Sequence, residues 1–466
     1  MPSILGANTL SSGGYEVGNS LRLDNNAYMQ SANTNSTNNP WTFSVWIKRA
    51  KIGAEQTLIM SYTDSNDFGL IRFGSDDTLL IGDYVNGSYV MKYETNRKFR
   101  DVSAWYHIVV SQSAVSGASP ATLLYVNGVQ ETSFGTSNAY SQNDTQNWQK
   151  DGENFNFMMG QGEHYQQAYV CEAVWIDNTV YAASDFGEFD EDSGIWKPKD
   201  PSGLNFGTNG FYFDFADSGN LGDNEAGNSR ADFSENNIAA TDQSTDTCTN
   251  NFATLNILDP VQSDATYSEG NLKWATTTDG HFFWGRSTIG VSTGKWYAEF
   301  KATSIAEHSY VGIVNNGPED NTTVIAGGGG AATTTGAYEW AYKTSDGQIY
   351  NTDGGSSYGN TYGDGAIIGV LLNLDDNEIS FSKDGTVQNS GTAVSITAAA
   401  STPHGFYFFA VADGASGTSA TFEANFGSPP YAISSGNADA NGHGNFEYAV
   451  PSGYFALNTK NLAEHG

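Results

Sequence analysis

The residues most capable of chemistry are three acidic side chains that alternate along the chain, Glu188, Asp190 and Asp192. On a strand, this alternation would place carboxylates on one face, where one could attack a glycosidic bond while another protonates the leaving oxygen. Gly187 precedes the trio, a Ser-Gly pair follows it, and no β-branched residue lies within it. Such flanks are typical of turns, so we predict a solvated acidic turn rather than a catalytic strand.

Acidic oxygens are also the ligands that calcium prefers. Asp185, Asp190 and Asp192 form one set that could hold an ion, and the adjacent Asp375 and Asp376 form another. Neither set completes the ligand shell that calcium requires, and a solvated turn explains both equally well. We therefore predict no required cofactor, with bound calcium as the alternative.

Three aromatic residues lie in polar loops and could bind sugar: Trp148, Tyr358 and Tyr362. A flat ring can stack on the apolar face of a sugar while neighbouring Asn and Asp side chains bond its hydroxyls. The competing interpretation is that these rings fold back over the core, because large apolar side chains are usually mostly buried. The sequence leaves both interpretations open.

No other arrangement of residues indicates catalysis. The seven histidines show no metal-binding spacing, and His107 alternates within a predicted strand, where a structural role is expected. Cys171 and Cys248 are far apart in the sequence, so a disulfide between them stays open. We predict that the protein is not an enzyme.

The charge balance limits the partners. The chain of 466 residues has 20 basic and 52 acidic residues, a formal net charge of −32. Such a surface repels nucleic-acid phosphates and anionic membranes, so we predict no nucleic-acid partner. No apolar run is long enough to span a bilayer and the N-terminus has no basic start, so we expect no membrane insertion, no secretory signal and synthesis in a cytoplasm.

Period-two alternation of apolar and polar residues is the main structural signal. It is clear in residues 41–48 and 378–383, and Asn86-Gly87, Asn127-Gly128 and Asp384-Gly385 indicate tight turns between strands. Helical periodicity is absent. These patterns predict an all-β protein with two antiparallel, jelly-roll-like β-sandwich domains.

A long stretch rich in Gly, Asn, Asp and Ser separates the two sets of strands. Aromatic residues such as those at 211–213 interrupt it, and a disordered linker would lack them. We call residues 184–260 the strap and predict an irregular but ordered connection. The predicted organisation is an N-terminal docking segment (1–19), a first sandwich (20–183), the strap (184–260), a second sandwich (261–432) and an extended tail (433–466).

The first half resembles the laminin-G/concanavalin-A-like lectin fold. SLRLDNNAYMQ, WTFSVWIKRA, WYHIVVSQ and LLYVNGVQ are similar to its opening strand, its Trp-bearing second strand, its W-x-H strand and the hairpin that follows. The resemblance implies a sandwich of a kind that often binds sugars and sometimes holds calcium. Some glycoside hydrolases of this fold carry an E-x-D-x-x-E strand, and the final Glu of that pattern is missing after Glu188 and Asp190.

The second half resembles the SPRY (B30.2-like) sandwich. GDGAIIGVLLNLDDNEISFSKDG is similar to its central signature, KWYAEF to an early strand and ATFEANFGSPPY to its last strand. The resemblance implies a second sandwich whose variable loops face proteins or other ligands.

The strap resembles a segment common in structural proteins of tailed phages from marine hosts, as does PSGYFALNTKNL in the tail. The resemblance implies a virion component, such as a fibre, spike or head/tail decoration, that adheres to host-surface polysaccharide or to other virion proteins. It also implies a homo-oligomer, with a trimer as the family-level expectation, located in the virion after assembly in the host cytoplasm. The alternatives are a glycan depolymerase on a concanavalin-A-like fold and a capsid cement protein without a receptor.

Overall fold

The computed structural model describes residues 14–24, 26–33, 40–117, 119–148, 150–160, 162, 164–258, 265–277, 283–315, 338–351, 354–414 and 419–466. Most of the predicted docking segment and the strap's last residue, Pro260, lie outside these ranges. The chain divides into two compact units, one ending at Asn251 and the other continuing from Phe252. Each unit is described below by itself.

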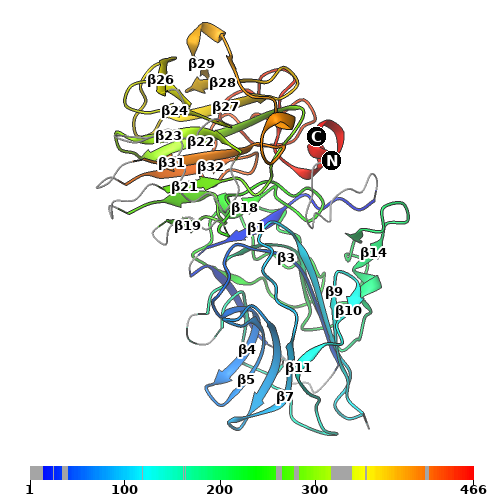
Figure 1. The fold of residues 1–466 in the computed structure, drawn as a ribbon. Coiled ribbons are helices and arrows are strands. Elements are labelled where there is room, and N and C mark those ends of the chain that lie inside the picture. Colours follow the sequence, from blue (N-terminus) through cyan, green and yellow to red (C-terminus); the bar gives the residue numbers. More distant parts are fainter. Residues whose placement is uncertain are drawn as a thin grey trace. The chain divides into compact units, whose positions relative to one another are not determined.

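The first unit contains two antiparallel sheets, which confirms the predicted sandwich class (Figure 1). Sheet A contains, in spatial order, β10 (Val129–Gln130), β9 (Thr122–Val126), β8 (Tyr106–Gln112), β3 (Trp41–Arg49), β13 (Ala168–Asp177), β1 (Ser20–Leu23) and β18 (Gln243–Ser244), and β16 (Phe211–Phe213) also pairs with β13. Sheet B contains β11 (Phe134–Asn138), β7 (Ser88–Thr95), β6 (Leu79–Val85), β5 (Asp67–Phe73), β4 (Gln56–Asp64), β12 (Asn154–Phe157), β2 (Tyr28–Ala32) and β17 (Ser234–Asn236).

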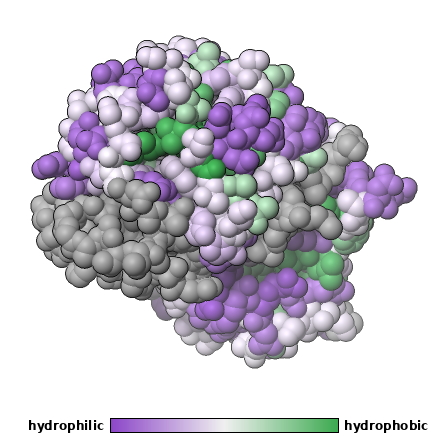
Figure 2. Space-filling model, turned by 45° about the horizontal axis from the view of Figure 1, so that its top comes forward, coloured by the Kyte–Doolittle hydropathy of each residue, from purple (hydrophilic) through white to green (hydrophobic). Residues whose placement is uncertain are grey.

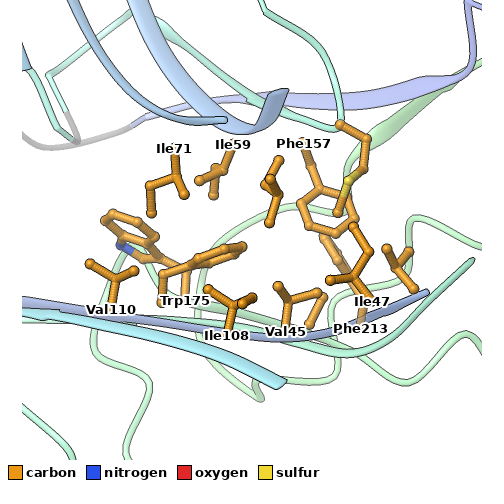
Figure 3. Packing of buried hydrophobic residues seen from close by; sticks show 14 of the residues in the cluster. Val45, Ile47, Ile59, Ile71, Ile108, Val110, Phe157, Trp175 and Phe213 are labelled. Atoms are coloured by element: carbon orange, nitrogen blue, oxygen red, sulfur yellow. The ribbon is translucent and has the colours of Figure 1, made fainter. Parts of the chain in front are cut away.

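The core of the first unit lies between sheets A and B. Val45 and Ile47 of β3 point toward Ile59 of β4 and Ile71 of β5, with Trp175 of β13 beside them (Figure 3). All five side chains are fully buried. Burial of one such side chain contributes about 1.5–3 kcal/mol, so this layer supplies much of the stability of the sandwich.

The strap adds strands to both sheets of the first unit. β16 and β18 extend sheet A, β17 extends sheet B, and β14 (Gly187–Phe189) pairs with β15 (Trp196–Pro198) as a separate hairpin. The rings of Phe211 and Phe213 enter the core. Each of these strands has only two or three residues, too few for an alternating pattern to be recognised in the sequence.

The strap also forms a further layer on the outer face of sheet A. Trp46 of β3 and Val174 of β13 pack there with Phe186, Phe206 and Tyr212 of the strap. This layer explains why both faces of the two strands are buried along their whole length.

A buried ion pair fastens the end of the strap to sheet A. The Lys48 ammonium lies 2.5 Å from Oδ2 of Asp246 and 2.8 Å from Oδ1 of Asn251. Burial lowers the pKa of Lys48, and the charge of Asp246 opposes that shift. Charged groups away from water need such partners, so these contacts keep the last residues of the first unit in place.

The second unit is also a two-sheet sandwich. Sheet C contains β19 (Thr266–Ser268), β20 (Lys273–Ala275), β32 (Thr421–Asn425), β22 (Lys295–Ser304), β27 (Ile367–Asn373), β28 (Glu378–Lys383) and β29 (Thr386–Val387), with β30 (Val394–Ser395) beside β28 and β33 (Phe455–Ala456) beside β22. Sheet D contains β21 (Phe283–Arg286), β31 (Phe408–Asp413), β23 (Ser309–Val314), β24 (Glu339–Lys343), β25 (Gln348–Asn351) and β26 (Gly354–Ser357).

The tail differs from the extended chain predicted for it. β33 pairs in parallel with β22, and α1 (Thr459–His465) follows directly. The side chain of Asn458 caps this helix by accepting a hydrogen bond from the backbone of Asn461 at 2.9 Å. The helix has seven residues, so it shows too little periodicity to be predicted from its sequence.

Strand accounts for 43% of the structure and helix for 5%, as the all-β prediction requires. Within the described residues, no helix combines the length and the apolar character needed to cross a membrane. On the face drawn in Figure 2, hydrophilic and neutral residues predominate and the hydrophobic residues form small separate areas.

Candidate ligand-binding site

The structure corrects the prediction that Trp148 could stack on a sugar. Its side chain is only 1% exposed and lies in the core of the first unit. The ring centroid is 4.9 Å from that of Trp41 and 5.4 Å from that of Trp175. The loop that carries Trp148 is polar, but the ring turns inward because its apolar area is better removed from water.

Tyr358 and Tyr362 are also core residues and not binding residues. Each is 5% exposed and packs against Tyr342 in the second unit. The Tyr358 hydroxyl accepts a hydrogen bond from the backbone of Phe381 at 2.8 Å, and the Tyr362 hydroxyl donates to the Tyr342 carbonyl at 2.9 Å. Their polar tips are therefore satisfied inside the protein, and their faces are not available to a ligand.

Two of the strap's predicted calcium ligands, Asp185 and Asp190, hold turns. Asp185 accepts a hydrogen bond from the backbone three residues earlier, at 2.8 Å. Oδ1 of Asp190 accepts from the backbone of Asp192 and of Ser193, and Oδ2 lies 3.1 Å from Nζ of Lys197. This is the geometry of an Asx turn.

These contacts hold Asp190 in its charged form. The hydrogen bonds from the backbone and side chain of Ser193, together with Lys197, lower the pKa of Asp190 to about 2. Within the described residues, no three His, Cys, Asp or Glu side chains are grouped so that they could hold a metal ion. Asp185, Asp190 and Asp192 do not converge, so a calcium site there stays a prediction without a ligand set.

Asp375 and Asp376 likewise have protein partners. Asp375 accepts a hydrogen bond from the backbone of Gly294 at 2.9 Å. Oδ2 of Asp376 lies 2.8 Å from Nδ2 of Asn373 and 3.2 Å from Nζ of Lys295. Both carboxylates thus support the turn between β27 and β28.

The β14 hairpin lies beside β9 and β10 (Figure 1). Residues of the β9–β10 turn and of the β14–β15 hairpin line a pocket of about 390 Å³. This volume is within the range of about 300–1,000 Å³ that is usual for small-molecule sites. The lining residues come from two distant parts of the sequence: Tyr125, Gly128, Ala182, Ala183, Ser184, Gly187, Glu188, Phe189, Trp196 and Lys199.

Two glycines clamp the central ring of this pocket, Trp196. A Cβ atom added at Gly128 would lie 2.2 Å from the Trp196 ring, and one added at Gly187 would lie 2.5 Å from it. Real Cβ atoms do not approach other atoms so closely, so both positions require glycine. The indole is therefore packed closely between the two glycine backbones.

His107 also holds the Trp196 ring, through a hydrogen bond to the indole nitrogen. The indole Nε1 of Trp196 donates to Nδ1 of His107 at 2.9 Å, and Nε2 of His107 lies 2.9 Å from Oγ of Ser44. Because indole can only donate, Nδ1 is the unprotonated nitrogen and Nε2 carries the proton. Burial lowers the pKa of His107 to about 3, so the ring stays neutral, in the structural role predicted for it.

The mouth of the pocket combines exposed apolar and charged side chains. Phe189 is 50% exposed, and its ring meets that of Trp196 edge-on at 4.8 Å. Val129, next to the pocket, is 57% exposed. The Glu188 side chain is 51% exposed and lies 3.6 Å from Nζ of Lys197. Because Glu188 pairs with Lys197 and Phe189 pairs with Trp196, the carboxylate and the two rings lie on opposite faces of the hairpin. The exposed Phe189 ring is suited to the apolar surface of a ligand.

Sequence analysis identified Glu188 but missed the rest of the pocket. Asn127-Gly128 was recognised as a turn, and Gly187 as a flank of the acidic trio, yet nothing indicated that Trp196 would lie between them. The pairing of β14 with β15 is local, but the position of this hairpin beside β9 is a long-range contact. Many Trp and Gly residues occur along this chain, so Trp196, Gly128 and Gly187 could not be recognised in the sequence as one site.

Comparison with known families identifies both domains. Residues 23–172 match the concanavalin A-like lectin/glucanases superfamily, and residues 295–427 match the SPRY domain. The chain therefore carries a concanavalin A-like, laminin-G-type domain and a SPRY domain, which confirms the two fold resemblances. Lectin-like domains of this class indicate a binding or adhesion role. The part of the pocket formed by residues 182–199 lies beyond the first match.

No curated protein matches the chain. Among solved structures, it is similar to the SPRY domain of human HERC1, with 16% identity over 33% of this chain and 87% of that one and a TM-score of 0.26. It is also similar to stonustoxin, with 18% identity over 37% of this chain and 27% of the stonustoxin chain and a TM-score of 0.27. A heptameric SAP-like pentraxin from Limulus polyphemus shows 14% identity over 36% of this chain and 80% of the pentraxin chain, with a TM-score of 0.28. The match spans about a quarter of stonustoxin, and TM-scores this low support no argument about function.

Proposed function

We propose that the chain is an adhesion protein whose first unit binds glycan in the pocket beside β14. The observation that carries this proposal is the half-exposed ring of Phe189, which meets the buried ring of Trp196 edge-on at the pocket. A sugar has an apolar face that stacks on such a ring. The Trp196 ring beneath Phe189 is buried and closely packed, so it provides a preformed support for the stacking ring.

Substitution of Phe189 tests the proposal directly. We expect Phe189→Ala to weaken binding to host-envelope polysaccharide about threefold to tenfold, since an aromatic contact contributes about 0.5–1.5 kcal/mol. Leu258→Ala is the matched control, because Leu258 is similarly exposed but belongs to the second unit. Unchanged affinity of the Phe189 variant in a glycan-binding assay would remove this site.

We further propose that this adhesion protein is a structural component of a tailed-phage virion, such as a fibre, spike or head/tail decoration. The support is the resemblance of the strap and of the tail segment to phage structural proteins. Its partners would be other virion proteins and host-surface polysaccharide, with no nucleic acid and no membrane insertion, and it would act as a homo-oligomer, a trimer by family-level expectation. It would be located in the virion after assembly in the host cytoplasm.

Two experiments on intact particles test the virion proposal. Antibodies to the purified protein should label intact phage particles in electron micrographs, and the same protein should compete with phage adsorption to host cells. Labelling without competition would favour a capsid cement role. Absence of labelling on intact and on disrupted particles would contradict a virion location.

We propose that the pocket binds without cleaving. Glycoside hydrolysis requires two carboxyl groups, and Glu188 is the one acidic residue among those that line the pocket. The neighbouring Asp190 is bound by Lys197 and by the Ser193 backbone. A reducing-sugar assay on host polysaccharide should therefore show no release, and release that depends on Glu188 would establish a depolymerase instead.

A further inference from the structure

We infer that Cys171 and Cys248 are a site of reversible disulfide formation, which joins the end of the strap to sheet A by a covalent bond under oxidising conditions. They are the two cysteines of the chain, and both are free thiols in this structure. Both side chains are fully buried in the layer that the strap forms on the outer face of sheet A. The inference concerns how the strap is fastened and is independent of glycan binding.

The sheet pairing places Cys171 on this outer face. Cys171 of β13 lies opposite Trp46 of β3, and residues directly opposite each other project from the same face of a sheet. Trp46 packs in the outer layer together with both cysteines. Lys48 follows Trp46 by two positions on β3, so it projects from the same face. Cys171 and Lys48 are therefore diagonal neighbours on the surface that the strap covers.

The contacts of the strap bring Cys248 to the same place. Asp246 and Asn251 both bind the Lys48 ammonium, at 2.5 and 2.8 Å, so the residues between them cross sheet A beside that side chain. The thiol of Cys171 has one hydrogen bond with the thiol of Cys248 and another with the backbone of Cys248. Two cysteines that form a disulfide must lie side by side, as these two do.

Formation of the bond requires an oxidant, and a small-molecule disulfide is the class that we propose. The thiolate of one cysteine attacks a sulfur of the small disulfide and releases one small thiolate. The thiolate of the other cysteine then attacks the protein sulfur of this mixed disulfide, which closes the Cys171–Cys248 bond and releases the second small thiolate. The two cysteines together lose two electrons and two protons, and the small disulfide takes up both and becomes two thiols.

This reaction needs a brief opening of the end of the strap. Burial raises the pKa of the Cys171 thiol and holds the pKa of Cys248 well above its ordinary value. Because the thiolate is the reactive form, both cysteines are inert while the strap covers them. Opening exposes them to the oxidant and to water together. The lysine contacts at Asp246 and Asn251 therefore control the rate of oxidation.

The bond would change the stability of the strap. The segment between the two cysteines contains β14 to β18, so the disulfide closes a long loop and restricts the unfolded chain. A reducing compartment keeps the pair as thiols, and an oxidising one favours the bond. A chain that passes from the first to the second would thus fasten its strap after it has folded.

Incubation of the reduced full-length protein with oxidised glutathione in native buffer tests the inference. Thiol titration after denaturation should then find no free cysteine, and the intact mass should fall by two hydrogen atoms without a glutathione adduct. Peptide mapping should recover the segments of Cys171 and Cys248 linked to each other. The melting temperature of the first unit should rise by about 5–10 °C and return to its starting value in dithiothreitol.

Variants then locate the effect. Cys248→Ser and Cys248→Ala should each melt at the same temperature with and without the oxidant. Asn251→Ala removes one contact of Lys48 with the strap and should speed bond formation about threefold to tenfold, whereas Glu191→Gln, at an exposed position elsewhere in the strap, should leave the rate unchanged. Two free thiols after prolonged oxidation, a stable glutathione adduct, dimers linked between chains, or a bond that lowers the melting temperature would each overturn the inference.

Discussion

The strap in the first unit and the tail in the second unit both cover the outer face of a sheet, but they are attached by different chemistry. Each contacts a buried glutamate of the sheet beneath it. In the first unit, the hydroxyls of Tyr212 and Tyr15 donate to Oε2 of Glu172 at 2.9 and 3.2 Å. Glu172 also has a positive φ of 49°, at an irregularity in the pairing of β13 with β3. The segment that carries Tyr212 pairs with β13 through its backbone, whereas the Glu172 carboxyl group itself contacts it only through side chains.

In the second unit, the backbone of the tail contacts the glutamate directly. Glu299 of β22 accepts hydrogen bonds from the backbone N–H of Glu447 at 2.9 Å and of Tyr448 at 2.8 Å. Tyr297 and Asn425 donate to the same carboxyl group at 3.0 and 3.3 Å. Burial raises the pKa of Glu299, and these four donors oppose the rise.

Glu172 and Glu299 show two ways in which a buried carboxyl group can be stabilised. Backbone N–H groups can only donate, so they require an acceptor and favour the charged form of Glu299. Phenol hydroxyls can donate or accept, so they suit a neutral carboxyl group as well. Burial raises the pKa of Glu172 to about 8, which keeps it largely protonated at neutral pH. We therefore expect the attachment of the strap to depend on pH through Glu172.

The largest expected effect is the pH dependence of the first unit. The pKa of Glu172 is 4.5 in its ordinary state and about 8 when folded, so between these values the folded state holds the extra proton. Stability contributed at Glu172 is therefore full below about pH 4.5 and falls as the pH rises toward 8, by roughly 3–5 kcal/mol over the whole window. Urea unfolding at pH 5 and pH 8 measures this change.

Glu172→Gln provides the comparison, because its side chain cannot ionise. Asp83, whose pKa burial raises to about 7, acts in the same direction within the same unit. The pH dependence of the wild-type unfolding free energy therefore reflects both Glu172 and Asp83. The difference between wild type and Glu172→Gln gives the contribution of Glu172. If the free energy of unfolding changes equally with pH in the two proteins, Glu172 does not titrate in this range. The contrast with the tail would then be lost.

The second prediction concerns the tail. Glu299→Ala leaves two backbone N–H groups of the tail without their acceptor. A fully buried group would cost about 1–3 kcal/mol, and these two are only partly buried, so we expect a total loss of roughly 2–4 kcal/mol. Calorimetric unfolding of the second unit measures it. Glu299→Gln retains an acceptor oxygen and should lose clearly less. Equal losses for Ala and Gln would mean that packing, and not the backbone contacts, holds the tail.

The sequence predicts the regular parts of both units and not these attachments. β3 and β28 alternate over enough residues to be recognised, and the turn at Asp384-Gly385 separates strands as expected. Glu172 and Glu299 look like ordinary strand residues, because their partners lie 40 and about 148 positions away. The pairing of distant segments, unlike alternation, leaves no local pattern.

The candidate pocket shows the same limit. Glu188 was recognised by its type, whereas Trp148 was selected as a binding residue because its neighbours are polar. Loop composition does not determine the direction of a ring, and the core of the first unit had room for Trp148 beside Trp41. Phe189, which is exposed, lies among acidic residues and drew no attention as an aromatic candidate.

The third prediction tests the end of the tail. Asn458 caps α1 and is fully buried, so Asn458→Ala should lower the stability of the second unit by about 1 kcal/mol. Asn458→Asp retains the capping oxygen and serves as the control in urea unfolding. A negligible loss for the alanine variant would indicate that packing of Leu462 alone holds the helix in place.

The smallest effect is expected at Asp185 in the strap, which caps a single turn and is partly exposed. Asp185→Ala should change stability by at most about 0.5 kcal/mol, as is usual for surface positions. Since Asp185, Asp190 and Asp192 are separate turn residues, the melting temperature should also be equal in EDTA and in millimolar calcium. A calcium-dependent rise that Asp190→Asn abolishes would mean that these carboxylates leave their turns to hold an ion. The strap would then be fastened by a metal as well as by Glu172, and its contrast with the tail would lie in the ion and not in the phenols.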